Sequence, residues 1–231
     1  MAAAVDAAET VADTMAYTRL ASPIIAGAPV SQATYPQAGE FAQLGALAGD
    51  ADTARRWLEV AAAPPPEPAA PSADPVDGVS VGAQDDAPPP PSAEHIAFAR
   101  WLTDLAEGAK GGLGERLSAE LLAEDDGAPA GAIPILVLWG AAVNAEARNQ
   151  LGEITLAPAG TRLPAGALLA VEAAAQAGAQ AETALRVALL IDAVANPDAL
   201  DVARLVAALN QVDLEAYARR IALEAVFAER P

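Results

Sequence analysis

The sequence contains no cysteine and a single histidine, His95. Without cysteine the chain has no disulfide framework, no thiolate-bound zinc or iron–sulfur cluster, and no cysteine nucleophile. One imidazole is also too few for the zinc sites that use two or three histidines. We therefore predict no metal site and no cofactor site from this composition.

Basic residues are scarce as well. Lysine and arginine together number 13 against 31 aspartates and glutamates, which gives a formal net charge of −18 at pH 7. Nucleic acids and anionic membrane surfaces are bound through lysine and arginine, so this balance argues against both as partners. The same acidity leaves one alternative open, in which the protein mimics nucleic acid and acts as a decoy for a nucleic-acid-binding protein.

Long apolar runs are missing too. The most hydrophobic stretch, at 132–143, is shorter than the roughly 20 residues that span a bilayer, and we expect a buried helix there and no membrane insertion. Residues 1–14 contain three acids and lack the positive start of a secretory signal. We expect a bacterial cytoplasmic protein, with the periplasm as the alternative if the chain is part of a longer protein.

Aromatic side chains make up only 4% of the chain, and runs of β-branched residues are few, whereas alanine is abundant. A core built largely on alanine buries little area per residue, so the backbones must pack closely, which helices do well. We predict an all-α fold with at least eight helices and no sheet of three or more strands. The expected helices lie near 3–19, 36–48, 50–62, 92–109, 115–123, 132–149, 164–178, 180–195, 198–211 and 213–229.

Proline and glycine set the expected boundaries. Residues 22–36 contain three prolines and are expected to be mostly loop, with one short turn of helix at 24–27. Gly111, Gly112 and Gly114 are expected to separate two helices. The segment 64–92 is rich in proline and acids and is expected to lack regular structure. We interpret it as a linker between an N-terminal helical segment, 1–63, and a C-terminal helical-repeat domain, 93–231.

The last four expected helices form two helix–turn–helix units of equal size. Pro197 and Pro231 are 34 residues apart, and the same interval separates Pro164 from Asp198. A helix pair of this size cannot bury its apolar face alone, so neighbouring pairs must stack. We predict stacked antiparallel helix pairs forming an α-solenoid, with an irregular helical bundle as the alternative.

One part of the chain resembles a tetratricopeptide repeat. The residues that carry the resemblance have the spacing of the second half of such a repeat, and they are Gly49, Ala54, Leu58, Ala61 and Pro66. In that family the glycine lies in the turn, the small residues admit the neighbouring helix, and the proline closes the unit. Ala218 and Ala225 match the small positions in the last unit, while the aromatic and Leu-Gly signature of the first repeat helix is missing. The resemblance implies a surface for protein partners.

An Ala-Arg motif recurs along the chain and supplies the candidate partner-binding residues. Four arginines are candidates for binding a partner's acids, and two tryptophans are candidates for an exposed hot spot: Arg55, Arg56, Arg219, Arg220, Trp57 and Trp101. The alternative is that the tryptophans anchor the core and that the arginines pair locally. Such pairs at i,i+4 spacing would join Glu215 to Arg219 and Arg220 to Glu224.

Two further features concern the C-terminal helices. Glu172 and Asp192 are isolated acids on apolar helices, and we interpret them as marking solvated faces; the alternative is a shared proton or a pair with Arg186. The helix expected at 180–195 is apolar around most of its circumference. We therefore expect it to be the central helix of the C-terminal array, with Leu189 buried.

These observations favour a non-enzymatic helical-repeat scaffold or adaptor that binds a protein partner, or a structural component of a bacterial assembly. The enzymatic alternative uses His95, the one side chain whose ordinary pKa lies near neutrality, with nearby groups such as Ser92 and Glu94. Because Ser92 precedes the first turn of an expected helix, we interpret it instead as the helix cap. The identity of the partner and the oligomeric state are left open.

Overall fold

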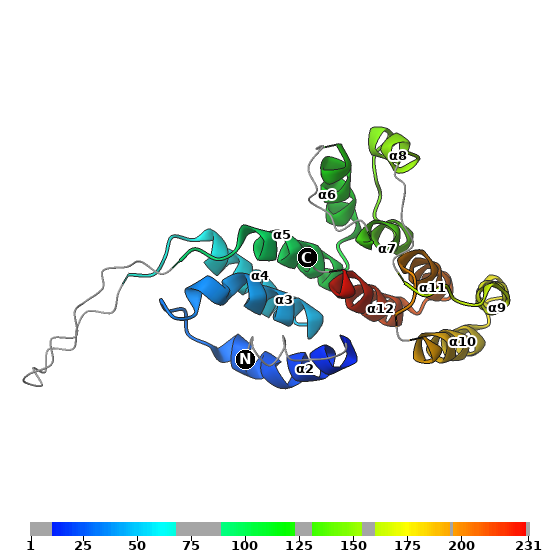
Figure 1. Ribbon diagram of the computed structural model, residues 1–231, viewed down its shortest axis with the longest axis horizontal. Helices are drawn as coiled ribbons and strands as arrows, with labels where there is room; N and C mark the ends of the chain where they lie inside the picture. Colours follow the sequence, from blue (N-terminus) through cyan, green and yellow to red (C-terminus); the bar gives the residue numbers. More distant parts are fainter. Residues whose placement is uncertain (1–10, 68–88, 123–130, 154–159, 195, 230–231) are drawn as a thin grey trace, which may run out of the picture.

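The computed structural model describes residues 11–67, 89–122, 131–153, 160–194 and 196–229. These residues form α-helices and one short 3-10 helix, arranged as an elongated array (Figure 1). The elements are α2 (Val11–Gly27), η1 (Tyr35–Gln37), α3 (Ala38–Leu47), α4 (Ala51–Ala62), α5 (Ala93–Glu107), α6 (Lys110–Leu122), α7 (Ala132–Trp139), α8 (Ala145–Leu151), α9 (Ala165–Gln176), α10 (Gln180–Ala193), α11 (Ala199–Gln211) and α12 (Glu215–Ala228).

The all-α fold class is confirmed for the described residues. Eleven α-helices are present there, more than the eight expected. The extended pairing in this part of the chain is a single parallel bridge between Thr161 and Pro197. No helix among the described residues has both the length and the apolar character required to cross a membrane.

Helices α3 and α4 form a tightly packed antiparallel pair near the N-terminus. Gly49 makes the turn with a φ of +79°, a conformation that favours glycine, and the Asp50 side chain caps α4 by accepting a hydrogen bond from the Thr53 N–H. At Gly45 a Cβ would lie 2.8 Å from the backbone nitrogen of Ala54, so the two helices touch backbone to backbone. The absence of a side chain at Gly45 therefore sets how closely the pair packs.

Helix α5 lies beyond the proline-rich segment yet packs against both α3 and α4. Residues 64–67 and 89–92 have no regular secondary structure, and the remainder of the expected linker lies outside the described residues. The larger core cluster extends from Ala46 to Phe227, and the rings of Phe98 and Phe227 are 6.4 Å apart. Helices on both sides of segment 64–92 therefore share one core.

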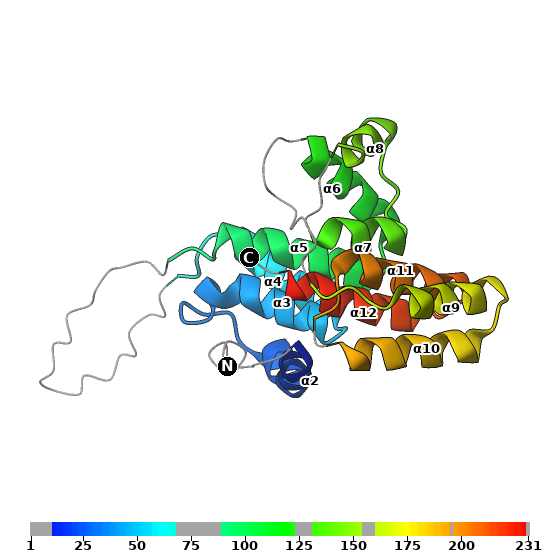
Figure 2. The ribbon, with the colours of Figure 1, turned by 45° about the vertical axis from the view of Figure 1, so that its right-hand side comes forward.

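Helix α11 is the central helix of the C-terminal array. It packs against α7, α9, α10 and α12, and Leu205 and Val206 on it are fully buried. Figure 2 shows α10 at the edge of the array, with α9 beside it. The α6 and α8 pair projects from the same array in both views (Figures 1 and 2).

The expectation that the 180–195 helix is central is wrong. In α10 only Thr183 and Val187 are buried, whereas Leu185 and Leu189 are 62% and 61% exposed. An apolar surface on most sides of a helix predicts neighbours on most sides. The physical reason for the difference is that α10 lies against α9 and the edge of α11, so only one side of it has a partner.

Two expected boundaries near prolines and glycines also differ. Helix α2 continues to Gly27 with Pro23 inside it, although 22–36 was expected to be mostly loop. Pro23 is exposed, so the carbonyl that loses its intrahelical partner can bind water, while Ile25, two residues further on, packs into the core. Helix α6 begins at Lys110 and includes Gly111, Gly112 and Gly114 instead of starting after them.

The helix expected at 132–149 is two helices. Helix α7 ends at Trp139 because Gly140 adopts a φ of +116°, and α8 begins after Asn144, whose side chain accepts a hydrogen bond from the Ala147 N–H. The loop between α7 and α8 contacts α6: the Asn144 N–H donates to the Ser118 hydroxyl oxygen at 3.0 Å. Gly140 thus redirects the chain to the projecting α6–α8 pair.

Candidate functional site

The Arg56-Trp57 pair on α4 binds the end of helix α2. The Arg56 guanidinium donates to the carbonyl oxygens of Ala26 and Ala28, and the Trp57 Nε1–H donates to that of Ile25 at 3.1 Å. Trp57 is completely buried and its ring lies 4.9 Å from that of Phe41. The last carbonyls of a helix have no intrahelical donors, and these two side chains supply them.

Arg55 faces the opposite side and pairs with acids of its own chain. It donates to Asp52 one turn away and to Glu107 at the end of α5, where the nitrogen–oxygen distance is 2.5 Å. The hydrogen bond that Arg55 donates to Glu107, followed by the one it donates to Asp52, raises the pKa of Arg55 above its ordinary value. This side chain is half exposed, so the pairs lie at the surface.

In the Arg219-Arg220 pair on α12, as in Arg55-Arg56, one arginine binds a helix end and the other binds an acid. Arg219 donates to the carbonyl oxygen of Ala106 in the last turn of α5, at 3.0 Å, and Arg220 pairs with Glu224 at 3.0 Å. The expected Arg220–Glu224 pair is therefore confirmed. Glu215 instead pairs with Lys110, at 3.1 Å.

The three tryptophans lie in the core. Trp101 and Trp139 are each 1% exposed, and like Trp57 they carry a cation beside one ring face. Arg116 lies 5.6 Å from the Trp101 ring centroid, and Lys110 lies 4.9 Å from that of Trp139. Trp57 and Trp101 are thus core anchors, the second of the two interpretations of these residues.

His95 lies at the start of α5 beside Glu40 of α3. The imidazole Nδ1 and the Glu40 carboxylate are 3.7 Å apart, and both side chains are partly exposed. The Ser92 hydroxyl accepts a hydrogen bond from the His95 backbone N–H, so it caps α5 as expected. The His95 carbonyl accepts from Gln43, which fixes this turn of α5 to α3.

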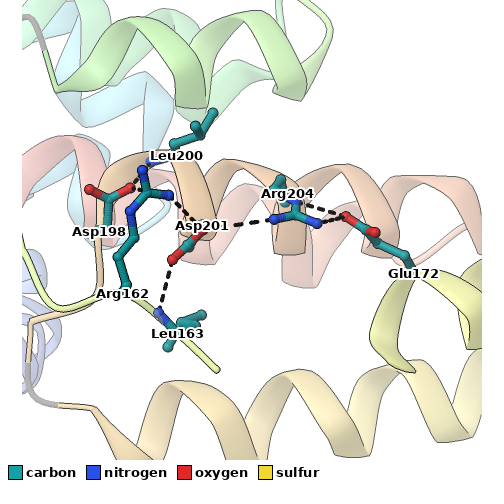
Figure 3. Close-up of polar contacts among 7 residues, drawn as sticks. All are labelled: Arg162, Leu163, Glu172, Asp198, Leu200, Asp201 and Arg204. Carbon is teal, nitrogen blue, oxygen red and sulfur yellow. Dashed lines mark hydrogen bonds and ion pairs between the residues drawn. The ribbon is translucent and has the colours of Figure 1, made fainter. Parts of the chain in front are cut away.

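A row of five charged side chains joins α9, α11 and the segment before α9 (Figure 3). Their signs alternate along the row, which runs through Glu172, Arg204, Asp201, Arg162 and Asp198. Arg204 contacts Glu172 at 2.7 Å, and the hydrogen bond that Arg204 donates to Glu172 is the main reason that the pKa of Arg204 is raised. Arg162 contacts Asp201 at 3.2 Å and Asp198 at 3.5 Å.

Asp201 is the buried centre of this row. Its side chain is 2% exposed and accepts a hydrogen bond from the Leu163 N–H at 2.9 Å. Asp198 caps α11 by accepting from the Leu200 N–H, and its own N–H donates to the Thr161 carbonyl oxygen. These contacts fasten the chain entering α9 to the start of α11, so the row holds the two helix pairs in register.

Sequence reasoning recognised only part of this row. Glu172 was expected to mark a solvated face, with a shared proton or a pair with Arg186 as the alternative. Arg186 pairs instead with Glu182 at 2.7 Å, and Glu172 pairs with Arg204 across the helix interface. The missed signal is the acid at Asp201, which follows the helix cap by three residues and lies on the face that carries apolar neighbours.

Groups of exposed large apolar side chains lie on α2 and on the α9–α10 pair, whereas five others are exposed singly on different elements: Val30, Leu122, Leu138, Leu200 and Tyr217. On α2 the group is Tyr17, Leu20 and Ile24, which share one side of the helix, with Leu20 75% exposed. On the α9–α10 pair the group is Leu169, Leu185 and Leu189. Within the described residues no three histidine, aspartate or glutamate side chains gather as a metal site requires. The exposed apolar side chains on α2 and on the α9–α10 pair are therefore the surface features that remain as candidates for binding.

Comparison with family models, with curated proteins and with solved structures yields no match to this chain. The described residues form an all-α array of packed helix pairs, with buried tryptophans and with exposed apolar side chains on α2 and on the α9–α10 pair.

Proposed function

We propose that this protein is a non-enzymatic helical scaffold or adaptor that binds a protein partner through an exposed apolar helix face. The observation that carries the proposal is the exposure of large apolar side chains in register on α2 and on α10. Single exposed apolar residues are common on protein surfaces, but several on one helix face are typical of interaction sites.

The use of the charged residues supports the same proposal. The candidate arginines bind helix ends and acids of their own chain, and the row around Asp201 fastens one helix pair to the next. These contacts stabilise a fixed arrangement of helices, and such an array presents helix faces at defined positions. A scaffold needs that rigidity, because binding costs less free energy when the surface is ordered beforehand.

A solenoid of tetratricopeptide type is the finer form of this proposal. Three observations favour it: the antiparallel α3–α4 pair with its glycine turn, the backbone contact of Gly45 with Ala54, and the neighbouring α9–α10 and α11–α12 pairs. The resembling residues Ala54 and Ala61 are buried at helix contacts, which is the role that the family assigns to its small residues.

Site-specific photo-crosslinking in cells of the source organism tests the proposed function. A photoreactive residue would replace Leu20 on α2 or Leu189 on α10, with Gln150 on α8 as an exposed polar control. We expect a discrete cross-linked protein species at one or both apolar faces and none at the control position. Equal cross-linking at all three positions, or none at any of them, would overturn the proposal.

A further inference from the structure

We propose, building on the proposed function, that the outward ridge of α10 binds an amphipathic helix of a partner protein that carries a basic residue beside its apolar face. Leu185 and Leu189 are one helical turn apart and are both more than 60% exposed. Their i,i+4 spacing forms a continuous ridge of the kind that packs into the groove of a second helix.

The residues around this ridge permit a close approach. Ala181 and Ala188 are exposed on the same side of α10, and their short side chains leave room for a partner helix. Glu182 and Arg186 lie beside the ridge and neutralise each other through an ion pair of 2.7 Å. Neither of these two charges therefore requires a partner from outside.

Asp192 has no charged partner among the described residues. It is exposed in the last turn of α10, three residues after Leu189 and seven after Leu185, so it continues the ridge toward the helix end. The last turn of a helix has a negative potential, and α10 has no basic residue there. Within the described part of the chain no ion pair or hydrogen bond involves its carboxylate.

These features determine the charge of the partner. A lysine or arginine placed one turn beyond the partner's apolar residues would meet both the Asp192 carboxylate and the negative end of α10. A second copy of this chain fits poorly, because each copy carries a net charge of −18. A two-fold pairing through α10 would also offer Asp192 no free basic group, because Arg186, the basic residue of α10, is paired with Glu182.

The position of α10 in the array agrees with this assignment. The α9–α10 pair lies at the edge of the helix array, with the outer side of α10 facing away from α11 (Figure 2). End pairs of stacked helical arrays have polar outer faces when they are exposed to water. Two exposed leucines at that position are instead what a helix–helix contact needs.

Selection from a displayed library of amphipathic helical peptides, with the full chain as bait, tests the proposal. We expect the enriched peptides to carry lysine or arginine one turn from an apolar pair and to bind at least about tenfold more weakly to the Leu185→Ser/Leu189→Ser variant. With Asp192→Arg as bait, the enriched basic position should change to glutamate or aspartate. The Leu20→Ser/Ile24→Ser variant on α2 is the matched control and should retain binding.

Two results would overturn the α10 assignment. One is selected peptides that bind the parent and the Leu185→Ser/Leu189→Ser variant with equal affinity. The other is a preference for lysine or arginine in the peptides that Asp192→Arg leaves unchanged. The three substituted residues of the two α10 variants are exposed, and thermal unfolding of each variant checks that the fold is retained. If the α10 assignment fails while photo-crosslinking at Leu20 captures a discrete partner, the scaffold proposal still stands. The absence of cross-links at both faces would instead remove the scaffold proposal itself.

Discussion

The indole nitrogen of Trp57 and the carbonyl oxygen of Ile25 are 3.1 Å apart, so a residue of α4 completes the last turn of α2. Arg56, the preceding residue, binds two more carbonyls of the same helix end. A cation at this position also interacts favourably with the negative end of the helix. The Arg-Trp dipeptide therefore accounts for the ordered end of α2 beyond Pro23.

Replacing Arg56 by alanine should lower the free energy of unfolding by about 1.5–3 kcal/mol, the range for hydrogen bonds that involve a charged group. The reason is that two carbonyl oxygens lose their donor at a partly buried helix end. Urea denaturation of the full chain measures this loss. Arg55→Ala is the matched control, and because the ion pairs of Arg55 lie at the surface we expect a smaller loss than for Arg56→Ala.

Equal losses for the two arginine variants would contradict the role of Arg56 in holding α2. Hydrogen exchange gives a second measurement, because Arg56→Ala should increase exchange in the last turns of α2 and leave α11 unchanged. Exchange that increases uniformly along the chain would indicate a global loss of stability and not the release of one helix end.

The central position of α11 predicts a larger loss of stability from a substitution there than from one on α10. Leu205→Ala should cost about 2–5 kcal/mol, the usual range for a fully buried leucine. Leu189→Ala on α10 should change stability by no more than about 0.5 kcal/mol, because that side chain is 61% exposed. The urea midpoints of the two variants measure the difference, and a comparable loss at Leu189 would show that α10 is covered.

The difference between these two leucines shows what the sequence can predict about this fold. Helix content, the caps at Asp50 and Ser92, and the all-α class follow from local patterns and are confirmed. The neighbours of each helix depend on the path of the whole chain, and the apolar pattern of α10 does not contain that information. A helix with apolar residues all around is expected to be buried, yet α10 keeps its ridge exposed.

The candidate site was less predictable than the fold for a related reason. Arg55 and Arg56 are adjacent in sequence, yet one binds surface acids and the other a helix end 28 to 30 residues away. Likewise, the local sequence around Asp201 shows only an acid near a helix start. Its partners, Arg162 and the Leu163 N–H, are brought to it by the fold. Long-range contacts of this kind have no signature in local spacing.

Removing the centre of the charged row should weaken the junction of α9 and α11. Asp201→Ala leaves the buried N–H of Leu163 without an acceptor, and we expect a loss of about 1–3 kcal/mol in the free energy of unfolding. Glu172→Ala, at the other end of the row, removes a pair whose partners are each about one-third exposed and should cost less than about 1 kcal/mol. Chemical denaturation of both variants distinguishes a buried anchor from a surface pair.

Glu229 should make the protein less stable as the pH rises. Burial, together with the negative charge of Asp198, raises the pKa of Glu229 above its ordinary value of 4.5. The folded state therefore holds this proton more tightly than the unfolded state, and its stabilising contribution is full below pH 4.5 and is lost as the pH rises through the folded pKa. Glu229→Gln should be more stable than the parent at pH 7.

The pH profile of unfolding checks the sign of this effect. The difference between Glu229→Gln and the parent should grow as the pH rises above the ordinary pKa of 4.5 and become constant above the folded pKa of Glu229. A variant that is less stable than the parent at pH 7 would show that the ionised carboxylate is stabilised, for example by the start of α7 near Gly131.

The glycines of α6 allow a matched pair of substitutions with opposite expected signs. At Gly112 a Cβ would meet no atom within 4 Å, so Gly112→Ala should stabilise the protein by about 0.5–1 kcal/mol through its higher helix propensity. At Gly114 a Cβ would lie 2.6 Å from the backbone nitrogen of Ala142, and backbone cannot yield as a flexible side chain does. Gly114→Ala should therefore destabilise the protein by about 1–3 kcal/mol.

Gly112 and Gly114 are a little more than half a helical turn apart, so they face nearly opposite sides of α6. Both substitutions raise helix propensity, and a difference between them therefore measures the effect of packing. The melting temperature, measured by thermal unfolding, should rise for Gly112→Ala and fall for Gly114→Ala. Hydrogen exchange should increase in the loop at 142–144 in the Gly114→Ala variant alone. Stabilisation by both substitutions would mean that α6 does not pack against this loop. The projecting α6–α8 pair would then lack the backbone contact that fixes its direction from the array.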